Sequence, residues 1–212
     1  MTALHAPPTA PVHGWAFGTD GPVRTIPNVI TAVRLIACVA LAIPAILSGS
    51  TMFTLASIAV YWIGDILDGE AARRLRQETR RGAVFDIVAD RISSTVVIAA
   101  LVQLRPTMAV PLALFLIQFD ILDCALSLSF LRWPLLSINY FHLVHRGVYR
   151  WNWSPPAKAA NTAGLVLLVA FGPSPVYATV FVVAVIAMKV VSLWAVCRIP
   201  RWSGPARPAD VD

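Results

Sequence analysis

Charged residues and cysteines are scarce in this 212-residue chain. Only 13% of the residues are charged and 58% are hydrophobic, which is too apolar for a soluble domain of this size. The three cysteines, Cys38, Cys124 and Cys197, stand singly in apolar sequence, so they predict neither a disulfide framework nor a zinc site. The P-loop, HExxH, CxxC and GxSxG motifs are also absent, which leaves the soluble enzyme classes that use them without support.

The first 25 residues do not read as a secretory signal peptide, which needs a basic start and a continuous apolar stretch. Beyond them, six apolar segments each approach the roughly 20 residues that a helix needs to cross a bilayer. They run at 28–48, 52–74, 82–104, 106–131, 157–171 and 175–197, with a tight turn predicted at Gly172 to Pro175. The expected fold is an all-α integral membrane bundle of six transmembrane helices. This domain, 26–200, would lie between a flexible tail at 1–25 and a C-terminal tail at 201–212.

Basic residues predict the orientation of this bundle. Of the 17 lysines and arginines, only Arg105 lies on the side of the short connectors. The positive-inside rule therefore places both termini and the long connectors, 73–81 and 132–158, in the cytoplasm, and we expect a bacterial plasma membrane. Topology and attraction to anionic lipids account for most of the net charge of +6, so no nucleic-acid partner is expected.

The most informative segment, DILDGEAARRLRQETRRGAVFDIVAD, runs from Asp65 to Asp90. An ionised side chain inside a membrane costs roughly 2.5–3.5 kcal/mol on insertion scales, so four aspartates here require a function. Asp65 and Asp68 are three residues apart, and Asp86 and Asp90 are four apart, so each pair shares one helical face. Two such pairs facing each other predict an oxygen-only cage for a hard divalent cation.

Both acidic pairs are also expected at the same depth. Asp65 lies 13 residues after Met52, and Asp90 lies 14 residues before Leu104. At 1.5 Å per residue, each is roughly 20 Å from the outer surface, in the cytoplasmic third of the bilayer core. A site at this depth can receive a lipid from the side and a water-soluble molecule from the cytosol.

Small and basic residues accompany the acids. Gly69 and Ala72 follow the first pair by one turn and Gly82 precedes Asp86 by one turn, so they allow either close helix packing or close approach of a ligand. Arg73 could clamp a phosphate, whereas its basic neighbours are interpreted as topology charges: Arg74, Arg76, Arg80 and Arg81. Carboxylates, a divalent cation and an arginine predict a pyrophosphate substrate with a lipid tail. One aspartate would take the proton from an attacking alcohol.

Written as a pattern, the segment is D-x2-D-G-x2-A-R-x8-G-x3-D-x3-D, and it resembles the signature of the CDP-alcohol phosphotransferase family at every fixed position. The resemblance implies transfer of a phosphatidyl or similar group from a CDP-linked donor such as CDP-diacylglycerol to an alcohol, with release of CMP. It also implies Mg²⁺ or Mn²⁺, six spans and a homodimer.

The resemblance assigns roles to individual positions. The metal ligands would be Asp65, Asp68, Asp86 and Asp90, with Asp90 as the general base. The cytidine diphosphate would be held by Gly69, Ala72, Arg73 and Gly82, with Thr79 near its phosphates. Residues 28–34 read N-x2-T-x2-R and resemble a motif of the phosphatidylglycerophosphate synthase branch that lies near the nucleotide. Its Asn28 and Thr31 could instead cap the first helix.

The acceptor is the least defined part of this prediction. Asp120 and Asp123, three apart in the fourth span, could bind hydroxyls of a neutral polyol or a lipid, or one of them could pair with Arg91 for structure. Basic residues stand near the cytoplasmic ends of the last two spans: Lys158, Lys189 and Arg198. In similar family members that use phosphorylated polyols, such residues bind the acceptor phosphate, although topology also explains them. Glycerol 3-phosphate, inositol, inositol phosphate and other polyols or lipids all stay open.

The connector at 132–157 is rich in aromatic residues, a composition typical of a segment at headgroup level. Its His142 and His145 have no further ligands in view, so an interfacial or acceptor contact is favoured over a metal site. The chain as a whole has two rival interpretations. An ion- or proton-coupled transporter also uses intramembrane carboxylates, but no inverted repeat is visible. An inactive scaffolding member of the same fold is disfavoured by the complete signature.

Overall fold

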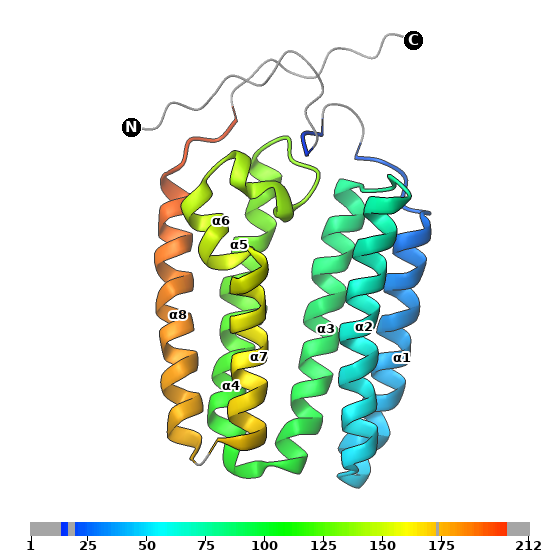
Figure 1. The fold of residues 1–212 in the computed structure, drawn as a ribbon, viewed down its shortest axis with the longest axis vertical. Helices are drawn as coiled ribbons and strands as arrows, with labels where there is room; N and C mark the ends of the chain where they lie inside the picture. The colour runs from blue at the N-terminus through cyan, green and yellow to red at the C-terminus, as the bar shows by residue number, and fades with distance from the viewer. Residues whose placement is uncertain (1–13, 17–19, 173, 203–212) are drawn as a thin grey trace.

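The computed structural model describes residues 14–16, 20–172 and 174–202, and every named element within them is a helix (Figure 1). Much of both expected tails and Pro173 of the expected turn lie outside these residues. The elements are α1 Ile26–Ser48, α2 Thr51–Arg74, α3 Arg80–Leu104, η1 Pro106–Met108, α4 Ala109–Ile117, η2 Gln118–Asp123, α5 Cys124–Leu128, η3 Ser129–Arg132, η4 Ile138–Leu143, α6 Arg146–Asn152, α7 Pro155–Phe171 and α8 Pro175–Arg198.

Among the described residues, five helical stretches are long and apolar enough to cross a membrane, so the fold is that of an all-α, multi-pass integral membrane protein. They are Ile26–Ser48, Thr51–Arg74, Arg80–Leu104, Pro106–Arg132 and Pro175–Arg198. The fourth stretch runs from η1 to η3 and contains the π-helical turn η2. The remaining expected span corresponds to α7, which has 17 residues. The count of six spans therefore stays a prediction.

The first long helix is bounded by local signals. The side chain of Thr25 accepts a hydrogen bond from the Asn28 backbone N–H (3.3 Å), which makes Thr25 the N-cap of α1. At the other end, Gly49 adopts φ 65° and its N–H reaches the Ala45 carbonyl (2.9 Å), the left-handed conformation that favours glycine. Neither Asn28 nor Thr31 is therefore the N-cap; the Asn28 amide donates to the Val23 carbonyl (2.6 Å), and the Thr31 hydroxyl lies 3.0 Å from the Pro27 carbonyl.

The helices pack as two groups joined by α3 (Figure 1). In the first group, α1 packs against α2 and α3. In the second group, an apolar cluster that includes Leu112, Leu165 and Val182 holds α4, α7 and α8 together. The start of α1 and the end of α8 lie at the same end of the bundle as α6, and we call this the α6 end (Figure 1).

The connector expected at headgroup level is a packed part of the α6 end. Trp133, Phe141 and Trp153 are buried, and the Phe141 ring lies 5.4 Å from that of Trp133 and 5.0 Å from that of Trp153. The backbone at 14–16 pairs with it, because Ala16 N–H donates to the Pro134 carbonyl (2.7 Å). Part of the expected N-terminal tail is thus fixed to the bundle. Trp151, which is 65% exposed, is the ring in this connector that best fits the interfacial expectation.

Candidate active site

Two acidic pairs from neighbouring helices converge near the α6 end. Asp68 stands six residues before the end of α2 at Arg74, and Asp86 stands six residues after the start of α3 at Arg80. One carboxylate oxygen from each of Asp65, Asp68 and Asp86 lies within 4.8 Å of the other two. Asp68 is buried while Asp65 and Asp86 are partly exposed, so the cluster has an inner wall and an open side. The sequence-based expectation that these helices bring their acids together agrees with this arrangement.

Arg34 of α1 lies at the centre of this cluster and connects all four carboxylates. Its Nε donates to Asp68 Oδ2 (2.8 Å), while Nη1 and Nη2 both donate to Asp90 Oδ1 (3.0 Å each). Nη2 also binds Asp86 Oδ1 at 2.5 Å and lies 3.5 Å from Asp65 Oδ1. Asp90 is thus linked to the other three acids through one guanidinium.

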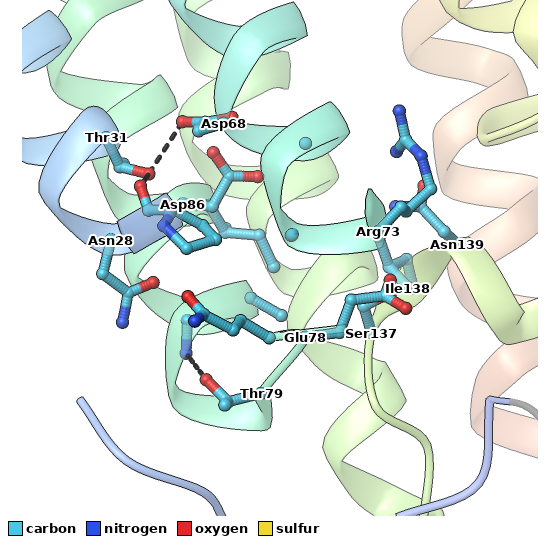
Figure 2. A pocket seen from close by; sticks show the side chains of 17 residues that line it. Asn28, Thr31, Asp68, Arg73, Glu78, Thr79, Asp86, Ser137, Ile138 and Asn139 are labelled. Atoms are coloured by element: carbon cyan, nitrogen blue, oxygen red, sulfur yellow. Dashed lines mark hydrogen bonds between the residues drawn. The ribbon is translucent and has the colours of Figure 1, made fainter. Parts of the chain in front are cut away.

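Arg34 is the last residue of the N-x2-T-x2-R pattern, and that pattern alone predicted no individual role for it. The signal that could have found it was the rule applied to the aspartates: an ionised side chain inside an apolar span needs a partner. Thr31, one turn earlier on α1, completes the contact, because its hydroxyl lies 2.7 Å from Asp68 Oδ2 (Figure 2). The first helix therefore supplies both a charge and a hydroxyl to the acidic site.

Gly64 makes room for the stem of Arg34. A Cβ on Gly64 would lie 2.5 Å from Arg34 Cβ and 2.7 Å from its Cδ, closer than real side chains approach. The Arg34 guanidinium carbon also lies 5.8 Å from the centre of the Tyr61 ring, within reach of a cation–π contact. The close crossing of α1 over α2 at Gly64 therefore sets where the guanidinium sits.

This donor set fits a hard divalent cation. The side chains offer carboxylate oxygens alone, the ligands that Mg²⁺ prefers in proteins. Four carboxylates with one guanidinium among them keep a formal excess of negative charge. The partial exposure of Asp65 and Asp86 gives a cation a path to these oxygens.

A cavity opens beside the acids, between α1, α2, α3 and the segment that leads into η4 (Figure 2). Asp68 and Asp86 line one side of it. All seven residues expected to hold the donor line it as well: Asn28, Thr31, Gly69, Ala72, Arg73, Thr79 and Gly82. The geometry thus gathers residues separated by more than 50 positions around one space next to the carboxylates.

The start of α3 forms a closely packed part of the cavity wall. The Thr79 hydroxyl caps α3 by accepting from Gly82 N–H (2.9 Å), so the positive end of the α3 dipole borders the cavity. A Cβ on Gly82 would lie 2.7 Å from Asn28 Oδ1 and 2.9 Å from Thr79 Oγ1. Gly82 therefore has no space for a side chain.

The α2 wall of the cavity is less crowded. A Cβ on Gly69 would meet Arg73 Nη1 at 3.4 Å, an ordinary contact with the end of a long side chain. Arg73 itself is partly exposed and binds Glu70 Oε2 (2.8 Å), one turn earlier on α2. An exposed ion pair of this kind is worth little, so the Arg73 guanidinium can exchange Glu70 for a phosphate at small cost.

The sequence reasoning missed the part of the cavity that comes from the 132–157 connector and from the end of the α2–α3 loop. These residues are Gln77, Glu78, Ser137, Ile138 and Asn139 (Figure 2). No sequence motif predicted them, because the connector reaches the cavity only through its packing in the folded bundle. The cavity is therefore assembled from the first helix group and the 132–157 connector rather than from the signature alone.

Tyr140 attaches this connector to the α2–α3 loop. Its hydroxyl donates a 2.8 Å hydrogen bond to Glu78 Oε2. Partial burial, together with the bond to Glu78 and its charge, raises the pKa of Tyr140 above its ordinary value. The phenol therefore stays protonated at neutral pH and remains a donor to Glu78.

The residues expected to bind the acceptor do not gather at one place. Lys158 Nζ binds Asn139 Oδ1 (3.0 Å), which lines the cavity. Asp123 instead binds Arg91 Nη2 (2.8 Å) and Lys189 Nζ (2.5 Å). This is the structural pairing with Arg91 that the sequence left open, and it includes Lys189 as well.

Two further acceptor candidates also lie outside the cavity lining. Asp120 Oδ2 accepts from the Thr95 hydroxyl (3.1 Å), and the Arg198 guanidinium carbon lies 3.5 Å from the centre of the Trp194 ring. The histidines of the connector have local partners: His145 Nδ1 accepts from Val148 N–H (3.1 Å) and caps α6, while His142 Nδ1 lies 3.2 Å from the Asn139 carbonyl.

Comparison with known proteins gives one match. The model of the CDP-alcohol phosphatidyltransferase family matches residues 24–196, from just before α1 almost to the end of α8. No curated protein and no solved structure matches the chain. The matched range contains the acidic cluster, the cavity and Arg34.

Proposed function

The chain belongs to the CDP-alcohol phosphatidyltransferase family and is a transferase of phospholipid synthesis, and from that premise we propose its donor, metal site and chemistry. The proposed donor is CDP-diacylglycerol. Its phosphatidyl group passes to the hydroxyl of an alcohol, and CMP is released. The single observation that carries this proposal is the cavity whose wall holds Asp68 and Asp86 together with the seven expected donor residues.

The nucleotide end of the donor is proposed to lie in this cavity. Gly69 and Ala72 let the pyrophosphate approach α2, and Gly82 lets it approach the start of α3. The α3 N-terminus, capped by Thr79, favours negative charge there. Arg73 would bind the donor phosphates, and Asn28 and Thr31 would border the nucleotide from α1. The acyl chains would then extend sideways into the bilayer.

The proposed metal ligands are Asp65, Asp68, Asp86 and Asp90. The proposal is supported by the convergence of oxygens from Asp65, Asp68 and Asp86 and by the oxygen-only chemistry of the set. Asp90 joins them through its bond to the Arg34 guanidinium that the other three share. The ion would be Mg²⁺ or Mn²⁺, which when bound would neutralise the pyrophosphate oxygens and the leaving phosphate.

Asp90 is proposed to be the general base. Both Arg34 donors to Asp90 reach its Oδ1, so the acceptor proton would pass to Oδ2. The acceptor oxygen then forms a bond to the phosphorus that carries diacylglycerol, the bond from that phosphorus to the CMP oxygen breaks, and CMP leaves. Arg73 would share the charge that develops on the pyrophosphate.

The acceptor would enter from the side of α7. Of the five candidates, Lys158 has the best support, because it binds the cavity residue Asn139. Its charge suits an acceptor that carries a phosphate, such as glycerol 3-phosphate or inositol phosphate, more than a neutral polyol. Asp123 and Lys189 already bind each other, so they are weaker candidates for the acceptor.

We further propose a homodimer in a bacterial plasma membrane, with a catalytic domain at 26–200 and the α6 end facing the cytoplasm. The basic residues of the long connectors support this orientation. The family assignment favours this transferase over the cation-coupled transporter that the intramembrane carboxylates also allowed.

The test uses purified protein in mixed micelles with CDP-diacylglycerol, Mg²⁺ and a panel of acceptors: glycerol 3-phosphate, inositol phosphate, inositol, serine and phosphatidylglycerol. CMP release and the mass of the lipid product are measured with and without a chelator. We expect chelator-sensitive CMP release that depends on one acceptor. CMP release that is indifferent to every acceptor or to the chelator would contradict the proposal.

A further inference from the structure

The acidic site contains a cation of its own, the Arg34 guanidinium, in addition to the divalent ion proposed above. The Arg34 side chain is 3% exposed, and every ion pair it makes is with one of the site carboxylates. It does not line the donor cavity. Arg34 therefore lies behind the acids rather than in front of them, where a donor phosphate would lie.

The charge of Arg34 has a direct effect on its neighbours. Four carboxylates brought to one place in a membrane repel one another, and a guanidinium among them offsets part of that repulsion. The same guanidinium occupies oxygens that a divalent cation also needs: its Nη2 binds Asp86 Oδ1 and lies 3.5 Å from Asp65 Oδ1. One positive charge thus both gathers the ligands and competes for them.

We propose that Arg34 is a positioning residue that acts as a built-in counter-cation. It holds the four aspartates together before the divalent cation binds, and by competing for their oxygens it weakens the binding of that cation. The inference rests on the metal site proposed above. It assigns Arg34 to the tuning of cation affinity, a role separate from donor binding and from proton transfer.

The anchoring of Arg34 explains how it can compete without being displaced. Its Nε is bound to Asp68 Oδ2, which also lies 2.7 Å from the Thr31 hydroxyl. Its stem lies in the space that Gly64 leaves open on α2. These contacts hold the charge near the carboxylates, so a cation that binds there is repelled by a fixed positive neighbour.

The test measures Mn²⁺ binding by electron paramagnetic resonance of free Mn²⁺, and thermal unfolding by tryptophan fluorescence in EDTA. Arg34→Gln removes the charge, whereas Arg34→Lys keeps it. We expect Arg34→Gln to melt about 5 °C or more below the wild type in EDTA. We also expect it to bind Mn²⁺ about tenfold more tightly, because one unit of repulsion at short range is lost. Arg34→Lys should bind Mn²⁺ within about threefold of the wild type.

A gentler variant covers the case in which Arg34→Gln does not fold. Gly64→Ala pushes on the Arg34 stem and should change both readouts in the same direction by a smaller amount. Gly69→Ala on the same helix is the matched control, because its Cβ meets only the flexible Arg73. Arg132→Gln loses bonds to two backbone carbonyls at the α6 end, so it should lower the melting temperature and leave Mn²⁺ affinity unchanged.

Failure of this inference differs from failure of the proposed function. If the wild type binds Mn²⁺ and releases CMP, but the Arg34→Gln and Gly64→Ala proteins bind Mn²⁺ with equal or lower affinity, the counter-cation role is wrong and the enzyme assignment stands. If the wild type neither binds Mn²⁺ nor releases CMP in a chelator-sensitive way, both proposals are overturned.

Discussion

Two acidic clusters in this bundle look alike in sequence but differ in charge balance. Asp65 and Asp68 are three residues apart, as are Asp120 and Asp123. The first pair joins two more aspartates and shares a single arginine with them. In the second cluster, Asp123 alone has two basic partners. The excess of carboxylates over basic partners, rather than their spacing, distinguishes a cation site from a structural ion cluster.

The surroundings of the two clusters differ in the same way. Asp68 and Asp86 border the cavity, whereas Asp123 lies between Arg91 of α3 and Lys189 of α8 and does not line it. Because α3 carries Asp86, Asp90 and Arg91, the second cluster holds to α8 the helix that carries two of the four proposed site acids. We interpret the first cluster as a candidate cation site and the second as an ion cluster that stabilises the packing of the helices.

The strongest test of this comparison is loss of the proposed base. Asp90→Asn should lower kcat by about a thousandfold, because general bases contribute roughly 10²–10⁴-fold, and should leave the KM for the donor within about threefold. Steady-state CMP release measures both constants. The matched substitution Asp120→Asn should keep kcat within about threefold. Equal losses in the two variants would remove the distinction between the clusters.

Breaking the second cluster should affect stability instead of chemistry. Asp123→Asn leaves Arg91 and Lys189 without their carboxylate, a change that typically costs about 3–5 kcal/mol in a buried setting. The thermal unfolding temperature should therefore fall, while Mn²⁺ affinity should match that of the wild type. The double variant Asp123→Asn with Lys189→Met should be less destabilised than the two single effects predict together. A change in Mn²⁺ affinity would mean that the second cluster takes part in the cation site.

The sequence predicted the first cluster better than the second for a physical reason. Residues on one helical face stay together whatever the helix packs against, so Asp65 with Asp68 and Asp86 with Asp90 could be paired in advance. Which helix packs against which depends on the tertiary structure, and the spacing of residues in one helix does not reveal it. The site contacts of Arg34 and the bond between Asp123 and Lys189 were therefore not predicted, although an isolated arginine in an apolar span was visible.

The cavity, too, could be predicted from the sequence only in part. Its α2 and α3 walls follow from the signature, and the seven expected donor residues all line it. Ser137, Ile138 and Asn139 come from a connector whose aromatic composition suggested headgroup contact. Its Trp133 and Phe141 rings are in fact buried together, and this packing delivers the neighbouring polar residues to the cavity. Composition does not reveal such packing.

Gly82 and Gly69, which both line the cavity near the first cluster, should respond differently to substitution by alanine. Gly82→Ala places a Cβ 2.7 Å from Asn28 Oδ1 and 2.9 Å from Thr79 Oγ1, so the α3 wall must shift. We expect the KM for CDP-diacylglycerol to rise about tenfold, the cost of one well-placed contact. Gly69→Ala, with 3.4 Å to a flexible guanidinium, should raise it by about threefold or less. The reverse order would mean that the donor lies closer to α2 than to the start of α3.

The smallest effect is expected where the 132–157 connector meets the α2–α3 loop beside the cavity. Tyr140→Phe removes one hydrogen bond to Glu78 and should cost about 0.5–1.5 kcal/mol of stability, with the donor KM within about threefold. Because the pKa of Tyr140 is raised, this contribution is fully present below its ordinary value of about 10 and is lost only as the pH rises through the higher folded value. The stability difference between wild type and Tyr140→Phe should therefore be the same at pH 7 and pH 9 in thermal unfolding. A difference that shrinks between those values would show that the Tyr140 hydroxyl ionises early and that its bond to Glu78 does not hold the connector to the α2–α3 loop.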